Sequence, residues 1–307
     1  MDRVKFLNFQ QFASLVNDVV KRPELLWQTQ APTVHIRPSS PPEAAYVVPT
    51  YATVEAAWAV IQNALDKVLT QQHLPHRDWL DAYDACYKLS VDRKHRELYN
   101  ALRDYLLRYC SNTYDTLAGL RHDALLVKYR NAWIQYTDGI PYIVKILQYL
   151  QRHFMEKLRR AEGLQNIPAL AVTLWRERLF VKLQDYVWVA VADLIQQERA
   201  GQQVNRSELR DVIGSYVRMG EANDMPMQLY QDSFEHPFLR LTRDYYAAIS
   251  SQFLQDNGPS IYMAKVEQLL SDEMDRASSY LDHSSKEKVC TLISMPLVSN
   301  PTVVTSM

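Results

Sequence analysis

The residues most able to do chemistry form no recognisable catalytic or metal-binding pattern. His73 and His76 are three positions apart, but they lie in a polar loop without a cysteine, and zinc needs three or four converging ligands. Cys86 falls in an expected helix, where no neighbour in the sequence would lower the pKa of its thiol. The sequence has no GxxxxGK[ST] or GxGxxG phosphate-binding loop and no GxSxG nucleophile motif. We therefore expect no enzymatic activity, no metal and no cofactor.

Two charged runs have simpler interpretations than a reactive site. The acidic run 272–275, which includes Glu273, lies in an expected helix beside Lys265 and Arg276, so we expect a solvated helix face. The basic run 157–160 ends another expected helix, where cations complement the helix dipole. A nucleic-acid surface would need more cations than this run supplies.

The composition is that of an ordinary intracellular protein. The chain has 307 residues, a formal charge of −1 and only seven glycines, which argues against sheets with tight turns and against phosphate-binding loops. Its three cysteines are far apart and odd in number, which fits a reducing compartment. No secretory signal and no membrane-spanning run is present. We expect a cytoplasmic or nuclear location, without affinity for nucleic acid or membrane.

Residues 1–50 differ from the rest of the chain. Six of the 14 prolines fall between Pro23 and Pro49, which is typical of a linker. Ahead of them, residues 4–20 have the pattern of one amphipathic helix. Whether this helix would dock on the rest of the chain stays open.

From Thr53 onward apolar residues recur at intervals of three and four, which predicts a helical protein. Thr53 is the expected N-cap of the first helix and Asp92 that of the third. Gly139 and Pro141 are expected to separate the fourth helix from the fifth. The five predicted helices of this block span 54–68, 79–89, a segment after 92, 117–136 and 141–160.

A second series of helices follows the break at 163–168. One helix is predicted over 169–200 and ends at Gly201, and the next is capped by Asn205 and ends at Gly220. Two more are predicted at 229–254, with a bend at Pro237, and at 261–281. We predict an all-α fold, an elongated stack of two helical repeats. The predicted parts are an extension at 1–50, a first repeat at 51–162, a second repeat at 163–295 and a disordered tail at 296–307.

Five segments, in order and at matching separations, resemble the cullin family. Each segment alone is weak, because Leu, Tyr and Glu at helical spacing are common. Together they cover roughly residues 54–292, and their sequences are most similar to those of the class of cullin that uses an F-box adaptor. The segments are 149–154 (YLQRHF), 170–176 (LAVTLWR), 194–201 (LIQQERAG), 212–217 (VIGSYV) with 229–239 (LYQDSFEHPFL), and 262–281 (YMAKVEQLLSDEMDRASSYL).

Within these segments we expect Glu198 and Arg199 to form ion pairs or a cap at a helix end. The large aromatic residues are expected to be core anchors that fix one helix against another. These anchors are Trp175, Tyr216, Phe234, Phe238, Tyr245 and Tyr246.

The resemblance implies a scaffold of a ubiquitin ligase whose first repeat binds a BTB-fold adaptor, which carries an F-box-type substrate receptor. In cullins the second and fifth helices of this repeat present an apolar and aromatic face, and exposed aromatic clusters mark partner sites. The corresponding residues here are Trp79, Ala82, Tyr83, Cys86, Ile143, Ile146, Leu147 and Gln151.

The sequence also departs from the family. Pro75 stands where many cullins have an aromatic residue, so we expect the second helix to begin late. Cullins continue into a C-terminal region that binds the RING subunit, whereas this sequence ends in a proline-broken segment. We therefore expect a truncated cullin without a RING contact, which would compete with a full-length cullin for its adaptor. The alternative is a helical-rod subunit of a multisubunit tethering complex.

Overall fold

The computed structural model describes residues 51–222, 227–256 and 259–298. All of them lie in the second of two units into which the chain divides, Val48–Met307. The predicted helix at 4–20 and the end of the predicted tail lie outside the described residues. Every regular element within the described ranges is a helix, which confirms the all-α fold. None of these helices combines the length and apolar character needed to cross a membrane.

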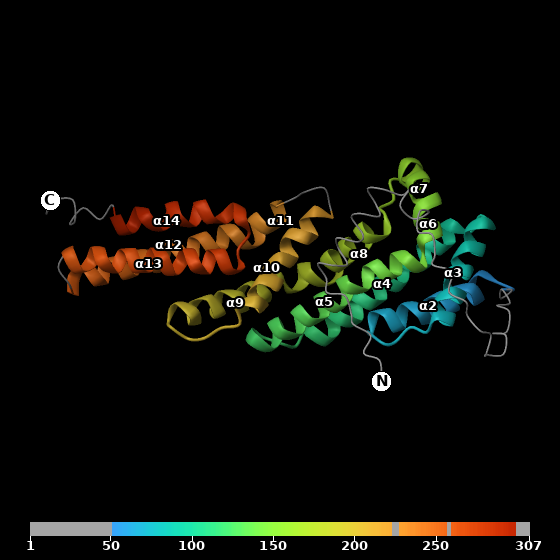
Figure 1. The fold of residues 1–307 in the computed structure, drawn as a ribbon, viewed down its shortest axis with the longest axis horizontal. Coiled ribbons are helices and arrows are strands. Elements are labelled where there is room, and N and C mark those ends of the chain that lie inside the picture. The colour runs from blue at the N-terminus through green and yellow to red at the C-terminus, as the bar shows by residue number, and fades with distance from the viewer. Residues whose placement is uncertain (1–50, 223–226, 257–258, 299–307) are drawn as a thin grey trace, which may run out of the picture. The chain divides into compact units, whose positions relative to one another are not determined.

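The first series of helices positions the predicted adaptor face (Figure 1). Helix α3 packs on α2 and α4, and α6 packs on both α3 and α7. Thr53 caps α2 as predicted, because its Oγ1 accepts a hydrogen bond from the backbone N–H of Ala56 at 3.2 Å. The elements are α2 (Val54–Leu69), α3 (His76–Val91), α4 (His95–Leu117), α5 (His122–Ile146), α6 (Gln148–His153) and α7 (Met155–Glu162).

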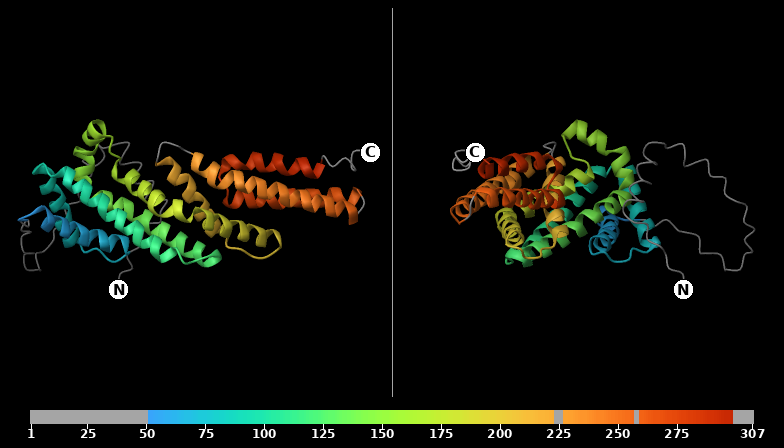
Figure 2. Two further views of the ribbon diagram at one scale, coloured as in Figure 1. Left: turned by 180° about the vertical axis from the view of Figure 1, so that it is seen from behind. Right: turned by 60° about the vertical axis from the view of Figure 1, so that its left-hand side comes forward.

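The second series begins after Gly163, which ends α7 with a left-handed φ of 68°. Helices α12, α13 and α14 lie side by side (Figure 2). Two π-turns, at 176–180 and 231–235, interrupt otherwise helical stretches. The elements are α8 (Ile167–Trp175), a π-turn (Arg176–Phe180), α9 (Val181–Arg199), α10 (Arg206–Glu221), α11 (Gln228–Tyr230), a π-turn (Gln231–Glu235), α12 (His236–Asp256), α13 (Pro259–Tyr280), a 3₁₀ turn (His283–Ser285) and α14 (Lys286–Val298).

Several predicted helix ends are wrong. Helix α3 begins directly after Pro75, so this proline serves as the N-cap residue and does not delay the helix. Lys94, and not Asp92, precedes α4. Gly220 lies inside α10, which ends one residue later. Helix α14 continues to Val298, because its packing on α12 and α13 outweighs the cost of a proline near its end.

The predicted break at Gly139 and Pro141 is also wrong, since α5 runs through both residues. The glycine serves close packing: a Cβ atom at position 139 would lie 2.7 Å from Cδ2 of Leu69 in α2. The proline removes one backbone hydrogen bond, but buried Ile140 and Ile143 hold the helix on either side of it. The predicted helix 141–160 is instead divided into the end of α5, α6 and α7.

We expect Gly139→Ala to lower the free energy of unfolding by roughly 1–3 kcal/mol, because the added methyl group must displace Leu69. The measurement is urea unfolding followed by far-UV circular dichroism. Gly214→Ala in α10 is the matched control, because nothing lies within 4 Å of its Cβ position. The control should raise stability by about 0.5–1 kcal/mol. A Gly139→Ala variant as stable as wild type would contradict this close contact.

The aromatic core residues join the two series. Trp175 is fully buried and stacks on Tyr136 with ring centroids 4.9 Å apart. It also meets Trp133 edge to face at 5.5 Å and Tyr129 at 6.2 Å. Five of the six predicted anchors are fully buried, and Tyr245 is half-buried. The contacts of Trp175 therefore fix α8 on α5.

Candidate partner-binding surface

Helix α3 buries one side and leaves the other partly open. Its packing against α2, α4 and α6 buries Ala82, Ala85, Cys86 and Leu89. These apolar residues recur at helical spacing, so a single face of α3 accounts for all of them. The opposite side of the helix is the one available to a partner.

Aromatic rings follow this open side of α3. Trp79 stacks on His76 with centroids 6.1 Å apart, and Tyr83 stacks on Trp79 at 5.6 Å. One turn later Tyr87 meets Tyr149 of α6 edge to face at 4.7 Å. Such contacts favour fixed ring positions, so these rings present a preformed apolar face.

We call this face the aromatic surface, and it consists of Trp79, Tyr83, Tyr87, Val91 and Tyr149. Its members are partly exposed: Tyr87 has 44% and Val91 51% of its surface accessible, and the other three are half-buried. Exposed large apolar residues scattered singly need no explanation, but a contiguous group marks a contact site.

Five of the eight predicted adaptor-binding residues lie in the core and not on this surface. Ala82, Cys86, Ile143, Ile146 and Leu147 are all 0% exposed. Burial also raises the pKa of the Cys86 thiol to about 11, which fits an inert core residue. We correct their assignment: these residues position α3, α5 and α6, but they offer no contact atoms to a partner that docks on this structure.

The other three predicted residues have different surroundings. Trp79 and Tyr83 lie together on the aromatic surface. Gln151 uses its side chain within the fold, because its Oε1 accepts a hydrogen bond from the backbone N–H of Ile167 at 3.2 Å. Since Ile167 is the first residue of α8, Gln151 links α6 to the second series of helices.

Tyr87, Val91 and Tyr149 were missed by sequence reasoning. A signal was available, because positions 79, 83, 87 and 91 follow one another at intervals of four. This spacing places all of them along one side of α3. Tyr149 belongs to a segment of family resemblance, but its contact with Tyr87 depends on the packing of α6 on α3.

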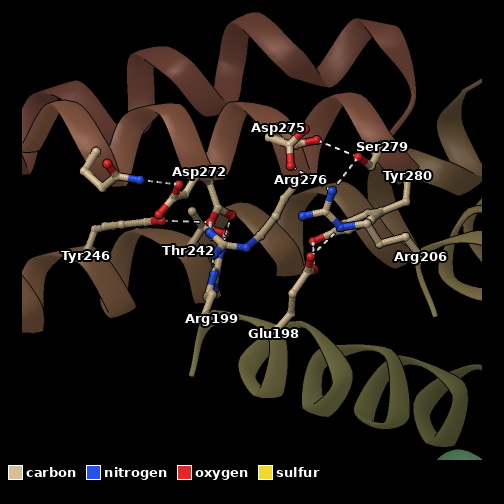
Figure 3. Close-up of polar contacts among 12 residues, drawn as sticks. Glu198, Arg199, Arg206, Thr242, Tyr246, Asp272, Asp275, Arg276, Ser279 and Tyr280 are labelled. Atoms are coloured by element: carbon tan, nitrogen blue, oxygen red, sulfur yellow. Dashed lines mark hydrogen bonds and ion pairs between the residues drawn. The ribbon is translucent and has the colours of Figure 1, made fainter. Parts of the chain in front are cut away.

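A cluster of charged and polar side chains lies between α9, α12 and α13 (Figure 3). The fully buried guanidinium of Arg199 donates to Glu273 at 2.5 Å and to the Thr242 hydroxyl at 2.7 Å. Arg276 and the Tyr246 hydroxyl also donate to Glu273, each at 2.8 Å. Burial alone raises the pKa of Glu273, but the hydrogen bonds and charges of Arg199, Tyr246 and Arg276 together lower it below its usual value.

This cluster corrects one prediction and confirms another. Glu273 is not part of a solvated face, because it is fully buried beneath Arg199. Glu198 and Arg199 form ion pairs as predicted, and Glu198 pairs with Arg206 at 2.6 Å. Because the charged form of Glu273 is held by two guanidinium groups, the cluster is suited to joining helices and unsuited to proton transfer. Within the described ranges, no group of three or more metal-ligating side chains converges on one point.

Comparison with known proteins agrees with this architecture. A family model described as the cullin alpha solenoid domain matches residues 58–304. The protein named Cullin-1 of Dictyostelium discoideum is 26% identical over 260 residues, which are 76% of this chain and 34% of that protein. Cullin-3A of Arabidopsis thaliana is 23% identical over 256 residues, 83% of this chain and 33% of that protein. Cullin-1 of Caenorhabditis elegans is 26% identical over 287 residues, which are 80% of this chain and 37% of that protein.

The chain thus spans about a third of the length of these relatives. The match begins within α2 and covers every later helix described above. It includes α3 and α6, which carry the aromatic surface. It also includes α9, α12 and α13, which enclose the cluster around Arg199 and Glu273. The chain belongs to the cullin family.

Proposed function

We propose that this chain is a scaffold component of a cullin–RING ubiquitin ligase and binds a BTB-fold, F-box-type adaptor through the aromatic surface. The protein would then act in ubiquitin-dependent protein degradation, in the cytoplasm or the nucleus, as a scaffold and not as a catalyst. The observation that carries the proposal is the row of partly exposed rings from Trp79 to Tyr87 on α3, which meets Tyr149 of α6.

The chemistry of this surface fits a stable protein partner. Binding energy at protein interfaces is concentrated in a few aromatic or arginine anchors, surrounded by contacts that exclude water. Trp79 and Tyr83 are half-buried and stacked on each other, so little side-chain entropy would be lost when a partner covers them. We expect these two side chains to be the anchors, and Tyr87 and Val91 to extend the contact along α3.

Because the relatives are about three times longer, a second role depends on the form in which the protein occurs. A form that consists of these 307 residues and binds the adaptor would compete with full-length cullins for it. Such a form would lower ligase output when it is abundant.

The test is capture of purified BTB-fold adaptors by the full chain, with affinities measured by surface plasmon resonance. We expect the double variant Trp79→Ala, Tyr83→Ala to weaken binding roughly 30- to 100-fold, because it removes both anchors. Tyr186→Ala is the matched control, since this tyrosine is 45% exposed on α9, outside the aromatic surface. Its affinity should stay within about twofold of wild type.

Two results would contradict the proposal. A folded double variant with wild-type affinity would place the adaptor site elsewhere on the chain. Failure of the folded wild-type chain to capture any adaptor of the panel would remove the ligase role and favour the tethering alternative.

A further inference from the structure

A basic region borders the aromatic surface. Residues 92–97 and 152–162 together contain seven Arg or Lys and four Asp or Glu, a net charge of +3, although the whole chain has a charge of −1. The rest of the chain therefore carries −4. The exposed cations of this region, which we call the basic rim, are Arg93, Lys94, Arg152, Lys157, Arg159 and Arg160.

Contacts of neighbouring residues place the basic rim beside the aromatic surface. Tyr149 lies 6.1 Å from the ring of Phe154, and Phe154 stacks on His95 at 4.5 Å. His95 is the first residue of α4, and Arg96 beside it forms an ion pair with Glu162 at the end of α7. These contacts join α6 and α7 to the start of α4.

The acids of this region neutralise only part of the rim. Lys94 pairs with Glu97 at 3.3 Å, and one carboxylate, Glu156, serves both Arg159 and Arg160. These cations remain largely exposed, with the side chain of Arg160 at 78%. Among the residues that the structure describes, Arg93, Arg152 and Lys157 have no acidic partner.

We infer that the adaptor that binds the aromatic surface carries an acidic patch beside its apolar contact area, and that this patch meets the basic rim. The inference rests on the proposed function and adds the charge of the partner to it. Surface ion pairs contribute little to affinity, because water and salt screen them. Complementary charge around an apolar contact instead raises the rate of association, because it steers the partners before they touch.

A nucleic acid would fit this region less well. The carboxylates of Glu97, Glu156 and Glu162 are interspersed with the cations, and they would repel a phosphate backbone. A net charge of +3 also supports few phosphate contacts, which provide most nonspecific nucleic-acid affinity. An acidic protein surface needs neither a long basic track nor the absence of acids.

The experiment measures association and dissociation rates of the full chain with the adaptor that it captures, at several salt concentrations. The variant is Arg152→Glu, Lys157→Glu, which changes the charge of the rim by four. We expect the association rate at about 50 mM salt to fall roughly tenfold, and the dissociation rate to stay within about twofold. In wild type the association rate should fall as salt rises, and in the variant it should depend on salt much less.

Three controls make the result specific. Arg240→Glu, Lys265→Glu makes the same change of charge at exposed positions of α12 and α13 and should leave the association rate within about twofold. The neutral variant Arg152→Gln, Lys157→Gln should give an intermediate rate. Thermal unfolding followed by circular dichroism establishes that each variant is folded.

The possible outcomes separate the two proposals. If wild type captures no adaptor, the proposed function fails, and this inference fails with it. If an adaptor binds but the rim variant associates at the wild-type rate, only the inference is overturned. Micromolar binding of a 20-nucleotide single-stranded RNA probe that the rim variant loses would also overturn it, in favour of a nucleic-acid partner.

Discussion

Glu273→Gln is expected to lower the free energy of unfolding by about 3–5 kcal/mol, because it leaves buried cations without a counter-charge. The substitution preserves the size of the side chain but removes the carboxylate that Arg199, Arg276 and Tyr246 share. Arg199 has no access to water that could replace this carboxylate. The measurement is the midpoint and slope of urea unfolding at pH 7, followed by circular dichroism.

The control is Asp275→Asn, two residues away on α13. Asp275 also pairs with an arginine, Arg206, but its side chain is 65% exposed, so the loss should be at most about 1 kcal/mol. Equal losses in both variants would show that burial of Glu273 does not determine the cost.

The same carboxylate should contribute to acid sensitivity. Its pKa in the folded protein is lowered from the ordinary value of 4.5, so its stabilising contribution is complete above about pH 4.5 and is lost as the pH falls through the lowered pKa. Wild-type stability should therefore decrease toward acid more steeply than that of Glu273→Gln, which has no proton to gain at this position. Parallel curves for the two proteins between pH 6 and pH 3 would contradict the lowered pKa.

Trp175→Ala is expected to destabilise the protein by about 3–5 kcal/mol, because it leaves a large cavity between α5 and α8. The rings of Tyr129, Trp133 and Tyr136 surround Trp175 and would lose their common contact. Trp175→Phe removes the indole N–H but only part of the ring.

We expect Trp175→Phe to cost less than half as much as the alanine variant in the same urea-unfolding assay. A phenylalanine variant as unstable as the alanine variant would show that the indole N–H is important to the fold. Adaptor binding by the phenylalanine variant should be unchanged, because Trp175 is fully buried outside the aromatic surface.

The fold was predictable from the sequence wherever a local signal was sufficient. Thr53 and Asn205 cap helices as expected, and Gly201 ends α9 with a φ of 85°. The errors arose where distant residues decide the outcome. Gly139 is a helix breaker by type, but it lies inside α5 because Leu69 of α2 occupies the space next to it. The burial of Glu273 could not be read from its acidic neighbours, because its partner Arg199 is 74 positions away.

The candidate site shows a more general limit. Trp79, Ala82, Tyr83 and Cys86 follow the spacing of an amphipathic helix, and that spacing identifies the face a helix buries in its own protein. Two of the four residues are indeed in the core. A search for an interface within a helical stack should instead look for large apolar residues outside the buried stripe, as at Tyr87.

The π-turn at 176–180 changes which face of the chain is buried, without a loop. A π-turn contains one residue more than an α-helical turn, so the helix that follows is rotated by about 100°. Burial follows this rotation: Leu174 is buried, Arg178 four positions later is exposed, and Leu179 five positions later is buried again. Helix α8 packs on both α4 and α5 before the turn, and α9 packs on α5 after it. Deleting one residue from the π-turn would restore regular helical phase and rotate the buried face of α9 about 100° away from its present neighbours.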